Sequence, residues 1–162
     1  MKLEDIRIDE ETWSTGHDAR RLEWRSAIQG IINAPDLSLA SEITLIRIRL
    51  TQQSTELAAF DEAGRRVSEV TLPHDILAPH IQEYVDIVRQ LAKTDSTGGL
   101  ARLEALDMAK KVCHDRAGRT ILRRCRALGL DHPTARRFYT LLVTLRVDTT
   151  RLVGVHGHRR IR

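Results

Sequence analysis

The stretch of residues 100–145 constrains the fold most, because apolar residues recur there at helical spacing between clusters of lysine and arginine. This pattern predicts three short helices. Gly118 and Gly129 suit the ends of the first two, since glycine takes up the left-handed backbone that often follows a helix. Asp131 followed by Pro133 suits the start of the third. The C-terminal third of the chain is therefore expected to be all-helical.

The preceding part of the chain predicts a small sheet. Residues 43–51 alternate apolar and polar side chains, which is the period of a half-buried strand. Residues 56–60 and 66–72 follow as strands around a hairpin turn at 61–64, where Gly64 can take a positive φ. With a short strand in residues 2–9, the prediction is an antiparallel β-meander of three to four strands. Helices over residues 19–33 and after Asp75 bring the covering layer to about five helices, giving an α+β fold.

The length of 162 residues favours one domain, which we place at residues 1–148, followed by a basic tail at 149–162. Aromatic residues make up only 4% of the chain, so the core must rest on Leu, Ile, Val and Ala. The tail can be disordered, or it can add an edge strand through Val153 and Val155.

Cysteine content and hydropathy indicate a cytoplasmic protein. Cys113 and Cys125 are too few for a disulfide framework. On a continuous helix they would lie about 18 Å apart, beyond the roughly 7 Å that a disulfide allows. We expect reduced, packed thiols. The sequence contains no apolar run long enough for a signal peptide or a membrane span, so no membrane partner is expected.

Charge is divided unevenly along the chain. Residues 1–108 carry 12 Lys and Arg against 19 Asp and Glu, whereas residues 109–162 carry 14 against 3. A basic half can attract an anionic partner. Equally, the two halves can face each other, within one molecule or across a homodimer, and this second interpretation is slightly favoured.

One group of polar residues is a candidate site. Asp107, Lys111 and His114 fall at i, i+4 and i+7 of a predicted helix, with Lys110 beside them. A carboxylate, an imidazole and cations at this spacing can perform acid–base chemistry or hold an anion. Arg136 and Arg137, in the first turns of the last predicted helix, can add fork-shaped donors, and the amino end of that helix also favours an anion. The same residues can instead form a structural network that holds helices in register.

No other motif in the sequence indicates a functional site. No nucleophile elbow, phosphate-binding loop or zinc pattern is found, so we expect no cofactor and no metal. His156 and His158 are close together, but they supply only two ligands.

The quoted residues also carry a resemblance. Ala105-Leu106-Asp107-Met108 with Lys110-Lys111 and His114-Asp115, then Thr134-Ala135-Arg136-Arg137 with Phe138 and Thr140-Leu141, resemble the small bacterial proteins grouped as uncharacterised protein family 0262. The similarity extends over roughly residues 3–146. The chain differs in having Cys113 within the motif and Ala117 in place of a glycine. The resemblance implies one shared fold unit and singles out these residues, and it implies no reaction.

Three functions follow from these observations. The favoured one is a non-enzymatic interaction module, acting on a protein partner or as a homodimer. The first alternative is an enzyme or a binder of a small anion, phosphate or carboxylate, that uses Asp107, Lys111, His114 and Arg136. The second is nucleic-acid binding through the basic C-terminal half. Few aromatics and the apolar Leu141, Leu142 and Leu145 in the would-be reading helix argue against it.

Overall fold

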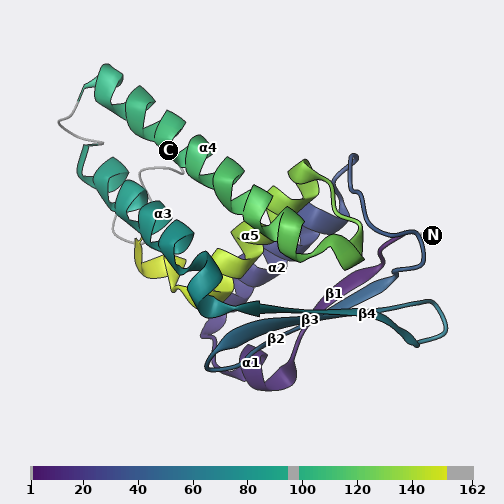
Figure 1. Cartoon of the computed structure of the whole chain (residues 1–162). Coiled ribbons are helices and arrows are strands. Elements are labelled where there is room, and N and C mark those ends of the chain that lie inside the picture. Colours follow the sequence, from purple (N-terminus) through teal and green to yellow (C-terminus); the bar gives the residue numbers. More distant parts are fainter. Residues whose placement is uncertain (1, 95–98, 153–162) are drawn as a thin grey trace.

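The computed structural model describes residues 2–94 and 99–152. Four strands and six helices follow one another along the chain, with the helices gathered on one side of the sheet and α1 at one end of it (Figure 1). In chain order the elements are β1 (Asp5–Ile8), α1 (Glu10–Ser14), α2 (Asp18–Ile32), β2 (Leu45–Leu50), β3 (Ser54–Phe60), β4 (Arg66–Pro73), α3 (His74–Thr94), α4 (Leu100–Arg124), the 3-10 helix η1 (Arg126–Leu128) and α5 (His132–Arg146). The predicted α+β class with a helical C-terminal part is confirmed.

The sheet has the strand order β1-β2-β3-β4. Strands β2, β3 and β4 form the predicted antiparallel meander. Strand β1 joins the meander by pairing parallel to β2, with Ile6 opposite Ile46, so the sheet is mixed and its fourth strand is not antiparallel. The reason is the connection: parallel neighbours need a long crossover, and helices α1 and α2 supply one. Helix α1 itself was not predicted.

The turn between β3 and β4 follows the sequence prediction. The Asp61 carboxylate accepts hydrogen bonds from the backbone N–H of Ala63 at 3.0 Å and of Arg65 at 2.9 Å. Gly64 has a φ of 80°, a left-handed conformation that glycine adopts without steric cost. The turn sets the register that places Leu57 opposite Val70.

The core lies between the inner face of the sheet and helices α2 and α5. Ile46, Ile48, Leu57 and Leu72 are each at most 1% exposed. Helix α2 is fixed to the carboxyl end of α5, because the Trp24 indole N–H donates to the carbonyl of Thr144 at 2.8 Å. Such bonds satisfy carbonyl groups that have no partner within their own helix.

For the C-terminal helices, one prediction is wrong and two are confirmed. The predicted break near Gly118 is wrong, because α4 runs unbroken from Leu100 to Arg124. Gly118 instead allows α5 to approach, as described below. Gly129 has a φ of 70° after η1, and Asp131 caps α5 by accepting from the Thr134 N–H at 3.0 Å. Both of these capping predictions are confirmed.

Part of the predicted tail belongs to the folded structure. Residues 149–152 form a helical turn in which Thr149 is buried and its hydroxyl donates to the Glu23 carboxylate. Leu152 packs against the core. The possible strand through Val153 and Val155 lies outside the described residues, as do His156 and His158.

Candidate site between helices α4 and α5

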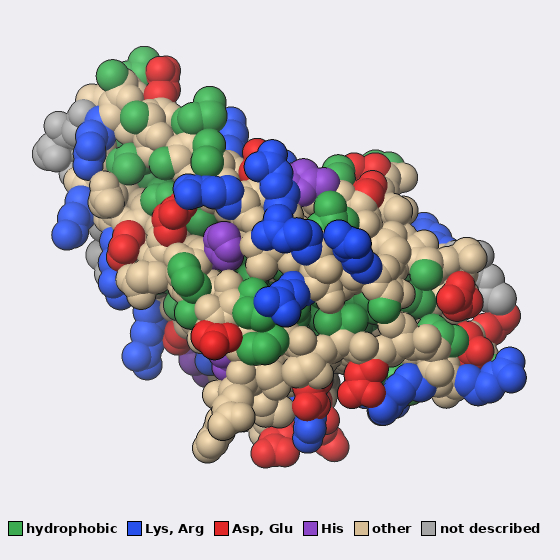
Figure 2. Space-filling view, viewed as in Figure 1, with side chains coloured by type: hydrophobic (Ala, Val, Ile, Leu, Met, Phe, Trp, Pro, Cys, Tyr) green, Lys and Arg blue, Asp and Glu red, His purple; other side chains and the backbone are tan. Residues whose placement is uncertain are grey.

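Helices α4 and α5 pack lengthwise because small residues of α4 face α5. Ala117 and Gly118 are buried in α4, and a Cβ added to Gly118 would lie 2.7 Å from Cγ of Arg136. Helix α5 buries Phe138 and Leu142 on its inner side. Close backbone approach therefore brings the polar residues along the outer edge of both helices together. Figure 2 shows Lys and Arg side chains gathered where α4 crosses α5.

A hollow of about 280 Å³ lies along this edge. Its lining consists of His114 from α4 and Pro133, Arg136, Arg137 and Thr140 from α5. The structure thus brings together three of the sequence-predicted site residues, the imidazole and the two arginines, although more than twenty positions separate them in the chain.

His114 forms part of the wall between this hollow and the interior. Its ring stands edge-on between Tyr84, with centroids 5.2 Å apart, and Tyr139, at 5.3 Å. Its Nδ1 lies 3.0 Å from the carbonyl oxygen of Lys110, which can only accept, so Nδ1 carries the proton. Burial lowers the pKa of His114, and the hydrogen bond to Lys110 opposes this only in part. The ring is therefore neutral at pH 7, with its lone pair on Nε2.

The two arginines of the hollow each lie near a carboxylate. Arg136 Nε is 3.2 Å from Asp115, which also lies 3.6 Å from His132, and Arg137 Nη1 is 2.8 Å from Asp36. Both of these arginine nitrogens are buried, and each faces its carboxylate. A guanidinium offers five N–H donors, so each arginine keeps donors for another acceptor.

The remaining predicted residues lie outside the hollow. Lys110 places its ammonium 5.9 Å from the centre of the Tyr84 ring. Asp107 and Lys111 form an ion pair at 3.5 Å, with side chains 60% and 61% exposed, and neither lines the hollow. The hollow that His114 lines therefore does not include Asp107.

The amino end of α5 is not open to an anion in the way the sequence suggested. Asp131 already supplies a carboxylate there, and its hydrogen bonds with Thr134 lower its pKa. The hollow runs along the side of the helix instead. Sequence reasoning missed Asp36 and His132, and it noted Asp115 only through the family resemblance, because their contacts join separate elements.

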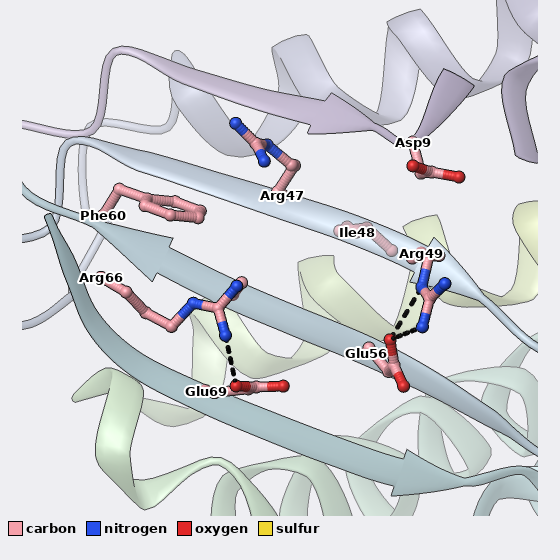
Figure 3. A pocket seen from close by; sticks show the side chains of 9 residues that line it. Asp9, Arg47, Ile48, Arg49, Glu56, Phe60, Arg66 and Glu69 are labelled. Carbon is pink, nitrogen blue, oxygen red and sulfur yellow. Dashed lines mark hydrogen bonds and ion pairs between the residues drawn. The ribbon is translucent and has the colours of Figure 1, made fainter. Parts of the chain in front are cut away.

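A second hollow, of about 360 Å³, lies on the outer face of the sheet (Figure 3). Arg49 pairs with Glu56 at 2.8 Å and Arg66 with Glu69 at 2.8 Å. Its floor includes Ala58, whose small side chain separates these two pairs. The sequence does not reveal this hollow, because only the cross-strand register brings its residues together.

The outer-face hollow is less suited to an anion than the one at α4 and α5. Of its three arginines, Arg47 alone forms no ion pair with a described residue, and its guanidinium lies 4.9 Å from the centre of the Phe60 ring. Since carboxylates balance the other two, little positive charge is left.

Within residues 2–94 and 99–152, no group of three or more His, Cys, Asp and Glu side chains is placed to hold a metal ion. Cys113 and Cys125 are buried free thiols. None of the described helices combines the length and the apolar character needed to cross a membrane.

Comparison with known proteins gave a match to a protein family. The family described as Uncharacterised protein family (UPF0262) matches residues 1–148, which is most of the chain. Neither the curated proteins nor the solved structures gave a match. The matched residues include all of the α4–α5 hollow and exclude the basic C-terminal end.

Proposed function

Since the chain belongs to Uncharacterised protein family (UPF0262), whose description names no activity, we propose a function from geometry: a non-enzymatic interaction module that holds an anionic group between α4 and α5. The group is a phosphate or a carboxylate, either on a small molecule or on a protein partner.

The observation that carries this proposal is the state of the two arginines. Both arginines line the hollow; Arg136 Nε and Arg137 Nη1 each face a carboxylate, and the other N–H donors of the two guanidinium groups are left for an acceptor in the hollow. Guanidinium groups match the two-oxygen edge of phosphate and carboxylate.

The arrangement favours binding over catalysis. The neutral His114 has a lone pair at Nε2, but the candidate acid, Asp107, faces solvent away from the hollow. The acids that do lie close, Asp115 and Asp36, are paired with arginines. A hollow lined by His114 and the two arginines thus offers electrostatic complementarity without an acid–base couple.

Nucleic-acid binding has less support. Leu141, Leu142 and Leu145 are at most 3% exposed, so α5 is a core helix and cannot place its length in a groove. Ion pairs Arg116–Glu83 and Arg137–Asp36 also engage basic residues with the acidic part of the chain.

A thermal-shift titration tests the anion proposal. Sulfate and phosphate are expected to raise the melting temperature of the full chain more than sodium chloride at equal ionic strength, since a ligand of the folded state stabilises it. The double variant Arg136→Gln/Arg137→Gln should lose this extra shift. Arg124→Gln removes an exposed arginine of α4 outside the hollow and should keep it. Equal shifts in the two variants, or an equal effect of chloride, would refute the proposal.

A further inference from the structure

The solvent-facing side of the first half of α4 is apolar. Ala101, Ala105, Met108 and Val112 recur at intervals of four, three and four residues, so they form one stripe along the helix. All four are exposed, Met108 by 59% and Val112 by 43%. Figure 2 shows hydrophobic side chains gathered over the outer half of the α3–α4 hairpin. A contiguous apolar surface of this kind marks an interaction site.

This stripe is not needed for the core of the single chain. The opposite side of α4 carries Leu106, Cys113 and Ala117, which are buried. Helix α4 packs there against α3 and α5. The first half of the helix is therefore apolar on two opposite sides, and folding accounts for only one of them. An amphipathic helix with one buried side would carry polar residues in place of Met108 and Val112.

We propose that the stripe pairs with the same stripe of a second copy of the chain, with the two α4 helices antiparallel about a two-fold axis. If the axis passes between Leu106 and Asp107, Ala101 faces Val112 of the second copy and Ala105 faces Met108 of the second copy. Each small side chain then meets a larger one. Alternation of small and large residues lets two helices approach closely and interdigitate.

Charges beside the stripe favour the same arrangement. Glu104 and Lys111 lie along one flank of the stripe, Glu104 before its centre and Lys111 after it. A two-fold axis perpendicular to the helices places like flanks together, so Glu104 of each copy comes beside Lys111 of the other. A two-fold interface contains each favourable pair twice. The Glu104–Lys111 contact would therefore occur once on each side of the axis.

The sequence also limits the interface to the first half of α4. Arg119 and Arg123 continue on the same face beyond Val112 and are exposed. In the proposed register they lie past the amino end of the partner helix. A second copy of the chain is therefore the partner that fits the stripe, because the side-chain sizes and the charges of the two copies complement each other. This surface is separate from the α4–α5 hollow, so either proposal can fail without the other.

Cysteine cross-linking tests the register. The double variant Ala101→Cys/Val112→Cys should form a covalent dimer under mild oxidation, because each new thiol faces the other position of the second copy. Within one chain the two positions lie about 16 Å apart along the helix, too far for a disulfide. The single variants should cross-link poorly. Dimers from either single variant alone would indicate a parallel or different pairing and overturn the proposed register. Absence of a covalent dimer from the double variant would also overturn the register.

Sedimentation of the full chain tests the association itself. The unmodified protein should be dimeric, and Met108→Glu should raise the dissociation constant on the order of a hundredfold or more, because the lost burial counts twice in a symmetric pair. Leu22→Glu is the matched control: Leu22 is 66% exposed on α2, outside the stripe, and its variant should remain dimeric.

Lys111→Glu should weaken the dimer, and Glu104→Lys in the same chain should restore it. A monomeric unmodified protein, or equal effects of Met108→Glu and Leu22→Glu, would overturn the proposal.

Discussion

Gly118 of α4 lies so close to Arg136 of α5 that a Cβ atom on the glycine would come within 2.7 Å of Cγ of the arginine. The missing side chain thus determines how near the two helices lie and where the guanidinium of Arg136 is held. The same helices form the wall of the anion hollow. Packing and the candidate site therefore depend on the same residue.

Substitution Gly118→Ala should destabilise the protein by about 1–3 kcal/mol, because overpacking displaces Arg136 near the base of its side chain. Displacement should also weaken sulfate binding. Gly30→Ala is the control: Gly30 lies within α2 with nothing within 4 Å of an added Cβ, so alanine there should stabilise by about 0.5–1 kcal/mol. Urea unfolding measures both values. A stabilising Gly118→Ala would show that Arg136 moves aside freely.

Asp115→Asn should strengthen sulfate binding. The carboxylate of Asp115 competes with a bound anion for Arg136, and asparagine keeps an oxygen near Nε while removing the charge. The free energy of unfolding should change by less than about 1 kcal/mol, because the pair is half-exposed. Calorimetric titration with sulfate measures the affinity. Weaker binding in this variant would mean that Asp115 acts mainly by holding Arg136 in place.

Much of the fold could be predicted because it depends on local patterns. The alternation in residues 43–51, the Asp61–Gly64 turn and the Asp131 cap each reflect chemistry within a few positions. The parallel pairing of β1 and the unbroken α4 could not be predicted, because they depend on contacts between distant elements. Gly118 fits a helix end and a helix crossing equally well, and only the position of α5 distinguishes the two.

The candidate site was predictable to a similar extent. Helical spacing placed His114 on the same helix face as Asp107 and Lys111, but it could not show which part of that face α5 would cover. The convergence of His114 with Arg136 and Arg137 required the three-dimensional path of the chain. Their carboxylate neighbours, Asp36 and Asp115, come from other elements and could not be assigned from local patterns.

Asp107→Asn should leave both stability and sulfate binding almost unchanged. Asp107 pairs with Lys111 on the exposed side of α4, and both side chains are about three-fifths exposed. Such a surface pair contributes roughly 0–1 kcal/mol. Thermal shift with and without sulfate measures both properties. If sulfate no longer raised the melting temperature of this variant, Asp107 would belong to the candidate site.

The two cysteines should not react with thiol reagents in the folded protein. Burial raises the pKa of the Cys113 thiol to about 11 and that of Cys125 to about 12, so the reactive thiolate is scarce at pH 8. Both thiols should react at once in denaturant. Colorimetric thiol titration before and after unfolding measures this. Rapid reaction of either cysteine in the native protein would contradict the burial described here.

Stability should fall as the pH drops below about 6.5, and His114 should contribute to the loss. Burial lowers the pKa of His114 in the folded state. Between that lowered pKa and the ordinary value of 6.5, the unfolded chain binds a proton that the folded chain does not, so the free energy of unfolding decreases with decreasing pH. One such group gives a slope of at most about 1.4 kcal/mol per pH unit.

His114→Phe should make this pH dependence shallower without abolishing it. Phenylalanine keeps an aromatic ring between Tyr84 and Tyr139 but cannot take up a proton. His74 and His80, whose pKa values burial also lowers, still contribute. Urea midpoints at several pH values between 5 and 7.5 give the slopes of both proteins. Sulfate, which keeps its charge over this range, should bind the unmodified protein more tightly as the pH falls, because protonated His114 adds a cation to the hollow. An unchanged slope in His114→Phe would place the titrating group elsewhere.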